Sequence, residues 1–249
     1  MLLMLAALQC VCAQPVCSGS GFAKPVCDAL MRARAEGMRS DALFVDIGAA
    51  GGGERRVARR FGHPYLGFEC RTDEVRHLRE RFRDNVNETL VQACVSNHSG
   101  FVKIFHALDS SSLHPHTIEA LHSSQHKASL AAKTDGEKAP RQPGTRRPLY
   151  TVETSLAVTL DSVLLSAEGH QFPPVGFLKV DVQGHEPAVL SGALGVLRAH
   201  RPWVFYETSL LPAALGNGTL LRSLTLGYTC DCRGGTDCYC APPQAELRL

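Results

Sequence analysis

A carboxylate stands at the end of an apolar run, and glycines follow it directly. Asp46 comes just before Gly48, and Gly51–Gly53 complete the segment. Glycines permit a tight turn and a close approach of the backbone to a ligand, and a helix that begins after the turn directs its free amide groups at that ligand. A buried acid needs partners, which a cationic or hydroxyl-rich ligand supplies. The segment therefore predicts a nucleotide-like ligand.

A second acid, Glu69, ends the next apolar run. It follows Gly48 by about twenty residues, where a carboxylate binds the ribose hydroxyls of a nucleoside cofactor. NAD-dependent enzymes use the fingerprint Gly-x-Gly-x-x-Gly, but the second glycine position here is Ala50. That fingerprint also has no use for an acid before its first glycine. Asp46 therefore favours S-adenosylmethionine, whose sulfonium is cationic, and an NAD-dependent oxidoreductase remains an alternative.

The elements that position these residues alternate between helix-like stretches and short apolar runs, which is typical of a parallel α/β sheet. The expected strands are Ala42–Ile47, Tyr65–Glu69, Leu90–Val95, Phe101–Phe105, Gly176–Val182 and Trp203–Glu207. The expected helices are Asp28–Met38, Glu54–Phe61, Asp73–Asn85 and Pro187–Ala199, with a strand running into a short helix at Val158–Leu165. The tail, Tyr228–Ala241, predicts a hairpin. One doubly wound sheet accommodates this order.

The ligand of such a sheet lies at the carboxyl ends of its strands. Polar residues follow the fourth and fifth principal strands there, namely Lys179, Asp181, His185, Glu186 and Glu207. His185 titrates in a useful range, but an alternative is that it only caps the next helix. Glu186 opens that helix, where the dipole alone favours an acid. Asp161 is interpreted as a helix N-cap.

Several motifs in the same order carry a family resemblance. They are Val45–Ala49, Leu66–Glu69, Thr159–Ser162, Phe177–Glu186 and Val189–Ala193. The first resembles motif I of class I methyltransferases, and the combination is similar to the FkbM-type methyltransferases. The resemblance covers roughly residues 42–241 apart from an insertion. One position departs from the family pattern, because Gln183 replaces the usual acid before the glycine.

The resemblance implies a doubly wound, mostly parallel, seven-stranded Rossmann-like methyltransferase sheet that ends in an antiparallel hairpin. It implies O-methylation of a hydroxyl on a sugar or other small molecule, with S-adenosylmethionine as cofactor. The expected cofactor-binding residues are Asp46, Gly48, Ala49, Gly51, Glu69 and Ser96. The expected catalytic residues are Asp181 as base or substrate anchor, Lys179 as its electrostatic partner, His185 and Glu207. A non-catalytic, secreted, Cys-rich binding protein on the same fold is the alternative that Gln183 raises.

Composition bounds the remaining possibilities. The chain has 249 residues and a formal net charge of +2, so one α/β domain fits and no nucleic-acid partner is indicated. Residues 1–13 form a run that is apolar apart from Gln9 and the weakly polar Cys10 and Cys12; it is too short to span a bilayer, and we interpret it as a possible signal peptide. We expect a leading segment and helix at 14–40 and the methyltransferase domain at 41–249. A flexible insertion is expected at about 122–148.

Cysteine usage favours the secretory pathway or an extracellular location, with the cytoplasm as alternative. Apart from Cys10 and Cys12, the cysteines are at 17, 27, 70, 94, 230, 232, 238 and 240. Cys17 and Cys27 are expected to form one bridge. The four tail cysteines are expected to pair across the hairpin, with zinc binding as the second interpretation. The histidines between 106 and 126 are interpreted as loop residues, and no metal site is predicted.

Overall fold

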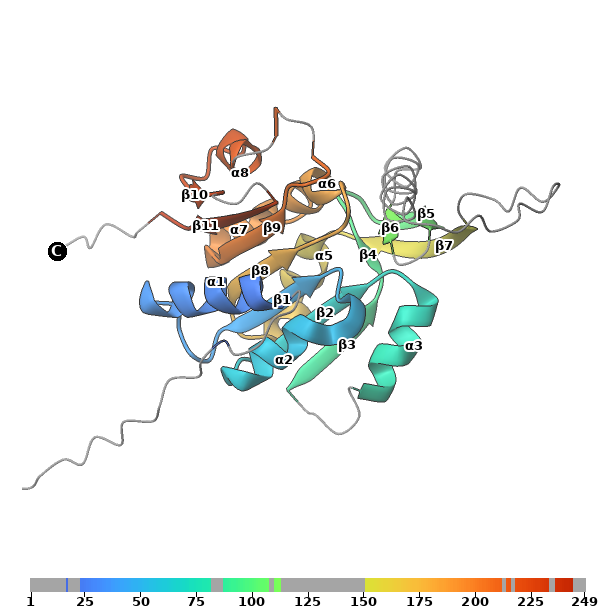
Figure 1. Cartoon of the computed structure of the whole chain (residues 1–249), viewed down its shortest axis with the longest axis horizontal. Coiled ribbons are helices and arrows are strands. Elements are labelled where there is room, and N and C mark those ends of the chain that lie inside the picture. The colour runs from blue at the N-terminus through green and yellow to red at the C-terminus, as the bar shows by residue number, and fades with distance from the viewer. Residues whose placement is uncertain are drawn as a thin grey trace, which may run out of the picture.

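A seven-stranded sheet runs through the molecule, with helices on both of its faces (Figure 1). The computed structural model describes residue 17 and residues 23–81, 87–107, 110–112, 151–211, 214–215, 218–232 and 236–243. The expected signal segment 1–13 and insertion 122–148 lie outside these residues. Among the described residues, no helix is long and apolar enough to cross a membrane.

The strand order of the main sheet is β10-β11-β9-β8-β1-β2-β3. The strands are β1 Leu43–Ile47, β2 Tyr65–Glu69, β3 Glu88–Gln92, β8 Val175–Val180, β9 Trp203–Glu207, β10 Thr229–Asp231 and β11 Asp237–Ala241. Neighbours from β3 to β9 are parallel, whereas β11 runs antiparallel to both β9 and β10. The strand order reverses between β1 and β8, so their carboxyl ends form the switch point of the sheet. This topology confirms the fold class expected from the sequence.

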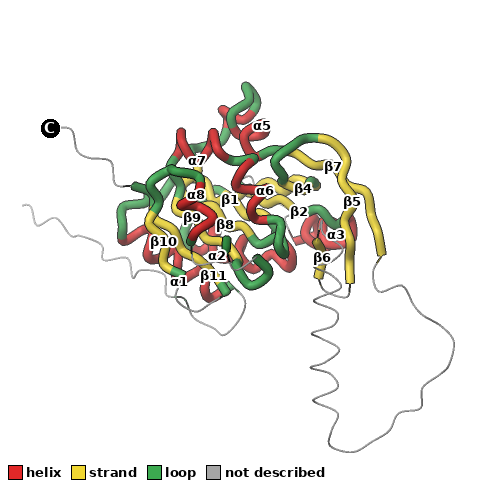
Figure 2. The backbone as a smooth tube through the Cα atoms, turned by 90° about the horizontal axis from the view of Figure 1, so that it is seen from above, coloured by secondary structure: helices red, strands yellow, loops and turns green. Residues whose placement is uncertain are grey.

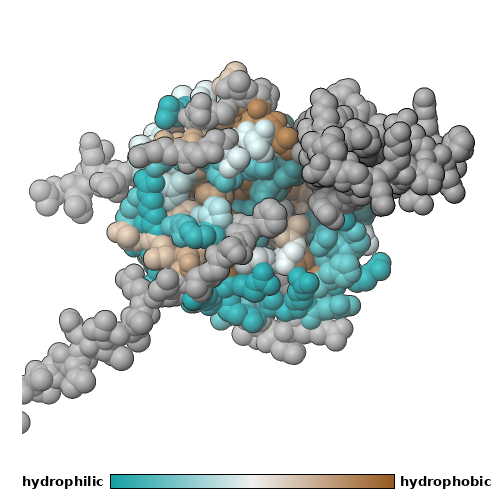
Figure 3. All heavy atoms as spheres, in the orientation of Figure 1, coloured by the Kyte–Doolittle hydropathy of each residue, from teal (hydrophilic) through white to brown (hydrophobic). Residues whose placement is uncertain are grey.

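Two apolar layers cover the sheet, and this explains the continuous hydrophobic runs of its central strands. One face packs against α1 (Lys24–Ala35) and α2 (Gly53–Arg60). The other packs against the short helices α5 (Leu160–Leu164), α6 (Glu186–Ser191), α7 (Leu194–His200) and α8 (Thr219–Ser223). The helix α3 (Thr72–Arg81) lies beside β3. The outer sides of α2 and α3 are hydrophilic, as their arginines and acids require (Figure 3).

A second, smaller sheet extends from one side of the body (Figure 2). Its order is β4-β7-β5-β6, with β4 at Cys94–Val95, β5 at Gly100–Ala107, β6 at Ser110–Ser112 and β7 at Thr151–Val158. The strand expected at Leu90–Val95 is thus divided between β3 of the main sheet and β4 of this one. The inner side of the small sheet buries Ile104 and Ala157 against Cys94.

The helix expected at Pro187–Ala199 is split into α6 and α7. A Cβ atom at Gly192 would lie 2.0 Å from the carbonyl oxygen of Ser96, so the glycine permits a close approach of two backbone segments. The N-cap interpretation of Asp161 was wrong for its own helix, because the Thr159 side chain accepts the hydrogen bond from Ser162 N. Asp161 instead accepts from the backbone N–H groups of Gly195 (2.8 Å) and Val196 (2.9 Å), in the first turn of α7.

Four disulfides join the described cysteines. Cys17–Cys27 ties the leading segment to α1, as expected. In the tail, Cys230 lies opposite Cys240 and bonds to it, and Cys232 bonds to Cys238. Cross-strand disulfides therefore account for all four tail cysteines. The fourth bridge, Cys70–Cys94, links the end of β2 to β4 and was not anticipated as a pair.

Candidate functional site

The ionisable side chains of the candidate site lie on the α1–α2 face of the sheet. On this face, residues that are paired between neighbouring strands form rows across the sheet. A lower row is aromatic, with Tyr65, Phe44, Phe177 and Trp203 side by side. Two residues further along each strand comes a middle row, consisting of Gly67, Asp46, Lys179, Phe205 and Tyr239. Continuing the register by two residues gives an edge row, consisting of Glu69, Gly48, Asp181, Glu207 and Asp237. Period-two alternation thus carries the face from an apolar layer to a charged rim.

The glycine segment forms the turn that the sequence predicted. Gly48 (φ 83°), Gly51 (φ 71°) and Gly52 (φ 66°) adopt left-handed conformations, which glycine tolerates best. A Cβ atom at Gly48 would lie 1.9 Å from the carbonyl oxygen of Asp181, so this glycine is required by the approach of β8. A Cβ atom at Gly51 would meet nothing within 4 Å, which leaves open space above the turn. The 3-10 turn η1 (Ala50–Gly52) then leads into α2.

The middle row contains a buried ion pair. Asp46 and Lys179 are both buried, and Lys179 Nζ lies 3.0 Å from Asp46 Oδ1. The ammonium also donates to the carbonyl oxygen of Gly48 at 2.7 Å. Tyr65 donates its hydroxyl to Asp46 Oδ2 at 2.6 Å. Gly67 makes this possible, because a Cβ atom there would lie 2.8 Å from the Tyr65 ring.

Burial and charge oppose one another in this pair. Burial raises the pKa of Asp46, and the nearby Lys179 ammonium counteracts that rise. Burial lowers the pKa of Lys179, but the charges of Asp46 and Asp181 outweigh this effect and raise it overall. We conclude that the pair is ionised, because separating either charge from its partner would leave it unsolvated.

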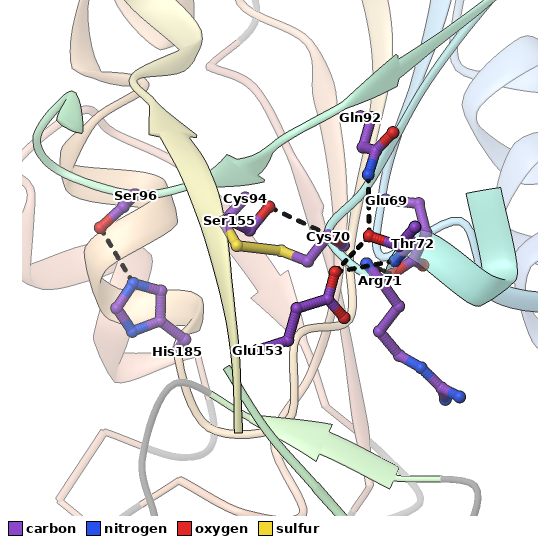
Figure 4. Close-up of a disulfide and its surroundings, with 10 residues drawn as sticks. All are labelled: Glu69, Cys70, Arg71, Thr72, Gln92, Cys94, Ser96, Glu153, Ser155 and His185. Atoms are coloured by element: carbon purple, nitrogen blue, oxygen red, sulfur yellow. Dashed lines mark hydrogen bonds between the residues drawn. A yellow bond between two sulfur atoms is a disulfide. The ribbon is translucent and has the colours of Figure 1, made fainter. Parts of the chain in front are cut away.

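The end of β2 is held by a disulfide and local hydrogen bonds (Figure 4). Glu69 is buried, and its Oε1 accepts from the backbone N–H of Arg71 at 2.9 Å. Burial raises the pKa of this carboxyl group. The next residue, Cys70, is bonded to Cys94, and its carbonyl oxygen accepts from the hydroxyl of Ser155 at 3.2 Å. The carboxylate at the edge of β2 is thus fixed by the small sheet as well as by its own strand.

Ser96, which follows β4, and His185, which precedes α6, point toward one another (Figure 4). Ser96 is buried after β4, and its Oγ lies 3.0 Å from His185 Nε2. His185 occupies the N-cap position of α6, but its side chain makes no capping hydrogen bond. Glu186, the first residue of α6, instead binds the loop before the helix, because its Oε1 accepts from the N–H groups of Val182 (3.0 Å) and Gly184 (3.3 Å). Burial raises the pKa of Glu186 to about 6.

Two carboxylates of the edge row share one amide. Gln183 Nε2 donates to Asp181 Oδ1 at 3.1 Å and to Glu207 Oε2 at 2.8 Å. Lys179 Nζ lies 3.8 Å from Asp181 Oδ2, so the buried cation also faces this pair. Burial and the charge of Asp181 raise the pKa of Glu207 to about 8. The arrangement therefore offers a proton acceptor, Glu207, whose pKa lies above neutral pH.

A cavity of about 550 Å³ opens beside these carboxylates, which is within the size range of small-molecule sites. Its lining residues are Pro25, Val26, Glu54, Lys179, Asp181, Phe205, Glu207, Thr236 and Asp237. The lining thus includes the first turns of α1 and α2 as well as the ends of β8, β9 and β11. Among the described residues, no group of three or more His, Cys, Asp or Glu side chains is arranged to hold a metal ion.

The structure brings the sequence-predicted residues together in three places. Asp46 and Lys179 form the buried pair, Asp181 and Glu207 border the cavity, and Ser96 meets His185. Of the expected cofactor-binding residues, Gly48, Gly51 and Glu69 lie at the sheet edge, whereas Ala49 is fully buried. Sequence reasoning missed three contributors: Tyr65, Asp237 and the amide of Gln183. The two-residue alternation along β2 and β11 was a signal for the first two.

The sheet, with its antiparallel strand β11 and its glycine turn at the switch point, defines an α/β fold of the methyltransferase type. The crystal structure of a methyltransferase FkbM from Methylobacillus flagellatus KT resembles it with a TM-score of 0.51 and 14% sequence identity. The match covers 83% of this chain but only 46% of that one, and at this identity it shows the fold alone. No curated protein matches the chain in sequence.

Within that class, one family accounts for the sequence. The model of the methyltransferase FkbM domain matches residues 46–224, which is most of the chain. The matched region includes the glycine turn, the Asp46–Lys179 ion pair and the two carboxylates Asp181 and Glu207. The chain belongs to the FkbM methyltransferase family. The resemblance inferred from its motifs is thereby confirmed.

Proposed function

We propose that the protein transfers a methyl group from S-adenosylmethionine to a hydroxyl group of a small molecule or carbohydrate. The observation that carries this proposal is the edge row, in which Glu69 and the glycine turn lie on β2 and β1 while Asp181 and Glu207, on the next two strands, line a cavity. The family membership supports methyl transfer in general. The oxygen acceptor is our inference from the carboxylates, which suit the removal of a hydroxyl proton.

The residues around the turn fit a nucleoside cofactor. Gly51 faces open space, so a ligand approaches the backbone there without obstruction by a side chain. Glu69 would bind the ribose hydroxyls from the adjacent strand end. When bound, S-adenosylmethionine supplies a methyl group on a positively charged sulfur. The edge row suits this charge, because its ionisable side chains Glu69, Asp181, Glu207 and Asp237 are all acids, while Lys179 is already paired with Asp46.

The chain's contribution to the reaction is alignment and proton removal. The cavity walls would orient the acceptor hydroxyl, and holding two reactants in line supplies much of the rate in a displacement reaction. Asp181 would accept the hydroxyl proton, with Lys179 beneath it stabilising its ionised form. Ser96 and His185, whose side chains lie 3.0 Å apart, would support the cofactor from the ends of β4 and β8.

We assign Asp46 an indirect role. It lies one row below the edge, fully buried, with Tyr65 on one oxygen and Lys179 on the other. Its effect on the cofactor would pass through the position of Lys179 and through the Gly48 carbonyl that Lys179 binds. Asp46 would thus shape the turn rather than contact the ligand.

We also propose that the protein folds in the secretory pathway or outside the cell. Four disulfides among the described residues point to an oxidising compartment, because cytosolic thiols are kept reduced. Alkylation of the purified protein before and after reduction tests this inference. Protection of the eight paired cysteines until reduction supports it, and free thiols at those positions in freshly isolated protein contradict it.

The proposed function is tested first by thermal unfolding with S-adenosylmethionine, with its demethylated product and with NAD. A ligand that binds only the folded state raises the unfolding temperature. We expect stabilisation by the first two ligands and none by NAD. Transfer of a labelled methyl group to a panel of sugars and small hydroxyl compounds, with matched amines and thiols beside them, then tests the oxygen acceptor. Stabilisation by NAD alone, or labelling of amines only, contradicts the proposal.

A further inference from the structure

Gln183 occupies an unusual place at the edge of the sheet. Its φ angle is 55°, so a residue with a side chain is held in the left-handed region just before Gly184. Backbone strain of this kind persists only where surrounding contacts determine it, and it concentrates at functional sites. The contacts here are the two carboxylates: one amide nitrogen reaches both Asp181 Oδ1 and Glu207 Oε2.

The chemistry of the amide explains why the two acids tolerate one another. Carboxylates that share a site repel each other, so one of them retains a proton to a higher pH. The shared amide nitrogen holds Asp181 Oδ1 and Glu207 Oε2 next to one another, at 3.1 Å and 2.8 Å from itself. The two N–H groups of Gln183 favour the ionised forms, because a donor to a carboxylate stabilises its charge. A third carboxylate at this position, which the family pattern places there, would have the opposite effect.

We propose that Gln183 is a positioning residue that holds Asp181 and Glu207 as one proton-sharing pair, and that this pair accepts the proton of the acceptor hydroxyl. The use of the pair rests on the proposed function, whereas the pairing itself does not. The pair takes up one proton as the acceptor oxygen bonds to the methyl carbon, and the electrons of the broken carbon–sulfur bond stay on sulfur. Charge and atoms then balance without a metal or a further reactant.

Other ionisable groups face the pair from each neighbouring element. Besides each other, Asp181 and Glu207 face Lys179 from β8, Glu186 from α6, Glu54 from α2 and Asp237 from β11. The first of these is a cation and the rest are acids. None of them donates an N–H to both carboxylates, which is the role the geometry gives to Gln183.

Two substitutions separate charge from size. Gln183→Glu is isosteric and adds a carboxylate, and Gln183→Met keeps the length but removes both donors. Both retain an unbranched Cβ in the left-handed backbone, so the strain is matched. Gln171→Glu makes the same chemical change at an exposed position and serves as control.

The decisive readout is the carboxyl ¹³C titration of the cofactor-free protein. In the wild type, we expect Glu207 to have the highest pKa of the carboxyl groups, near 8. Gln183→Glu should raise it by about one pH unit or more, and Gln183→Met by less, because a like charge has a larger effect than a lost donor. Gln171→Glu should not move it. The pH profile of methyl transfer should shift in the same direction.

Unchanged carboxyl titrations in both Gln183 variants would overturn the inference. If Gln183→Glu does not fold, as judged by circular dichroism, the Met variant decides alone. A shifted titration in a protein that transfers no methyl group under any condition would leave the pairing intact and refute the proposed function. The two proposals therefore fail in distinguishable ways.

Discussion

Two pairs of charged residues lie one row apart on the same face of the sheet and differ in almost every other respect. Asp46 and Lys179 carry opposite charges, are buried and form an ion pair with each other. Asp181 and Glu207 carry like charges, border a cavity and depend on the amide of Gln183. Along each strand, a side chain in the middle row lies in the protein interior, whereas the side chain two residues further on lies at the rim, the carboxyl edge of the sheet. Charge below the rim must be neutralised internally, whereas charge on the rim is available to a ligand.

The largest expected effect comes from breaking the buried pair. Asp46→Ala should reduce the free energy of unfolding by about 3–5 kcal/mol, because it leaves the Lys179 ammonium buried without its counter-charge. Denaturant unfolding measures the loss. The double variant Asp46→Ala/Lys179→Met should recover much of it, since no charge is then stranded. A single variant within about 1 kcal/mol of the wild type would show that the pair is not buried as the structure places it.

The rim should respond in activity rather than in stability. Asp181→Asn keeps the size of the side chain and removes its ability to accept a proton, so turnover should fall by about 10²- to 10⁴-fold. The dissociation constant for S-adenosylmethionine should stay within a few-fold of the wild type. Single-turnover kinetics and calorimetric titration give the two quantities. Equal losses in binding and turnover would place Asp181 among the cofactor contacts instead.

The pH dependence of stability distinguishes the rim from the interior. The folded-state pKa of Glu207 is raised from 4.5 to about 8, so the folded protein holds this proton while the unfolded chain releases it. Stability is therefore lost as the pH rises from about 4.5 to about 8. Glu207→Gln should flatten that part of the curve. The difference between the two curves reports Glu207 together with its coupling to Asp181 and Glu186, whose charges are among the causes that raise its pKa. Parallel curves would contradict the assignment.

The smallest effect is expected at an exposed ion pair. Lys24 Nζ lies 2.5 Å from Asp28 Oδ2 on α1, and both side chains are 51% exposed. Asp28→Asn should change the free energy of unfolding by less than about 1 kcal/mol, because water already solvates both charges. Denaturant unfolding beside Asp46→Ala makes the contrast direct. A loss comparable to that of Asp46→Ala would refute the view that burial sets the importance of these charges.

The sequence predicted the parts that depend on local pattern. Each main strand was predicted to end where its apolar run reaches a glycine or an acid. This placed Gly48, Glu69 and Asp181 at the carboxyl edge of the sheet. Continuous apolar runs were sufficient to predict the central strands, because these strands are buried on both faces of the sheet.

Contacts between segments that are distant in the sequence could not be predicted from local sequence patterns. The break between α6 and α7 depends on Ser96 lying against Gly192, and the role of Asp161 depends on α7 packing beside α5. The Cys70–Cys94 bridge requires the small sheet to align with β2, which no spacing in the sequence encodes. Gln183 was recognised as a departure from the family pattern, but its two partners became evident only from the register of β8 and β9.

Calorimetric titration of S-adenosylmethionine into the wild type and into Glu69→Gln tests the central claim most directly. Loss of the carboxylate that binds the ribose hydroxyls should weaken affinity by about 10- to 100-fold, which corresponds to about 1.5–3 kcal/mol for hydrogen bonds to a charged group. Asp28→Asn should bind as the wild type does. Saturable binding to the wild type, weakened only at Glu69, is the predicted result. No binding to the wild type, or equal affinity in both proteins, would show that the edge row is not the cofactor site.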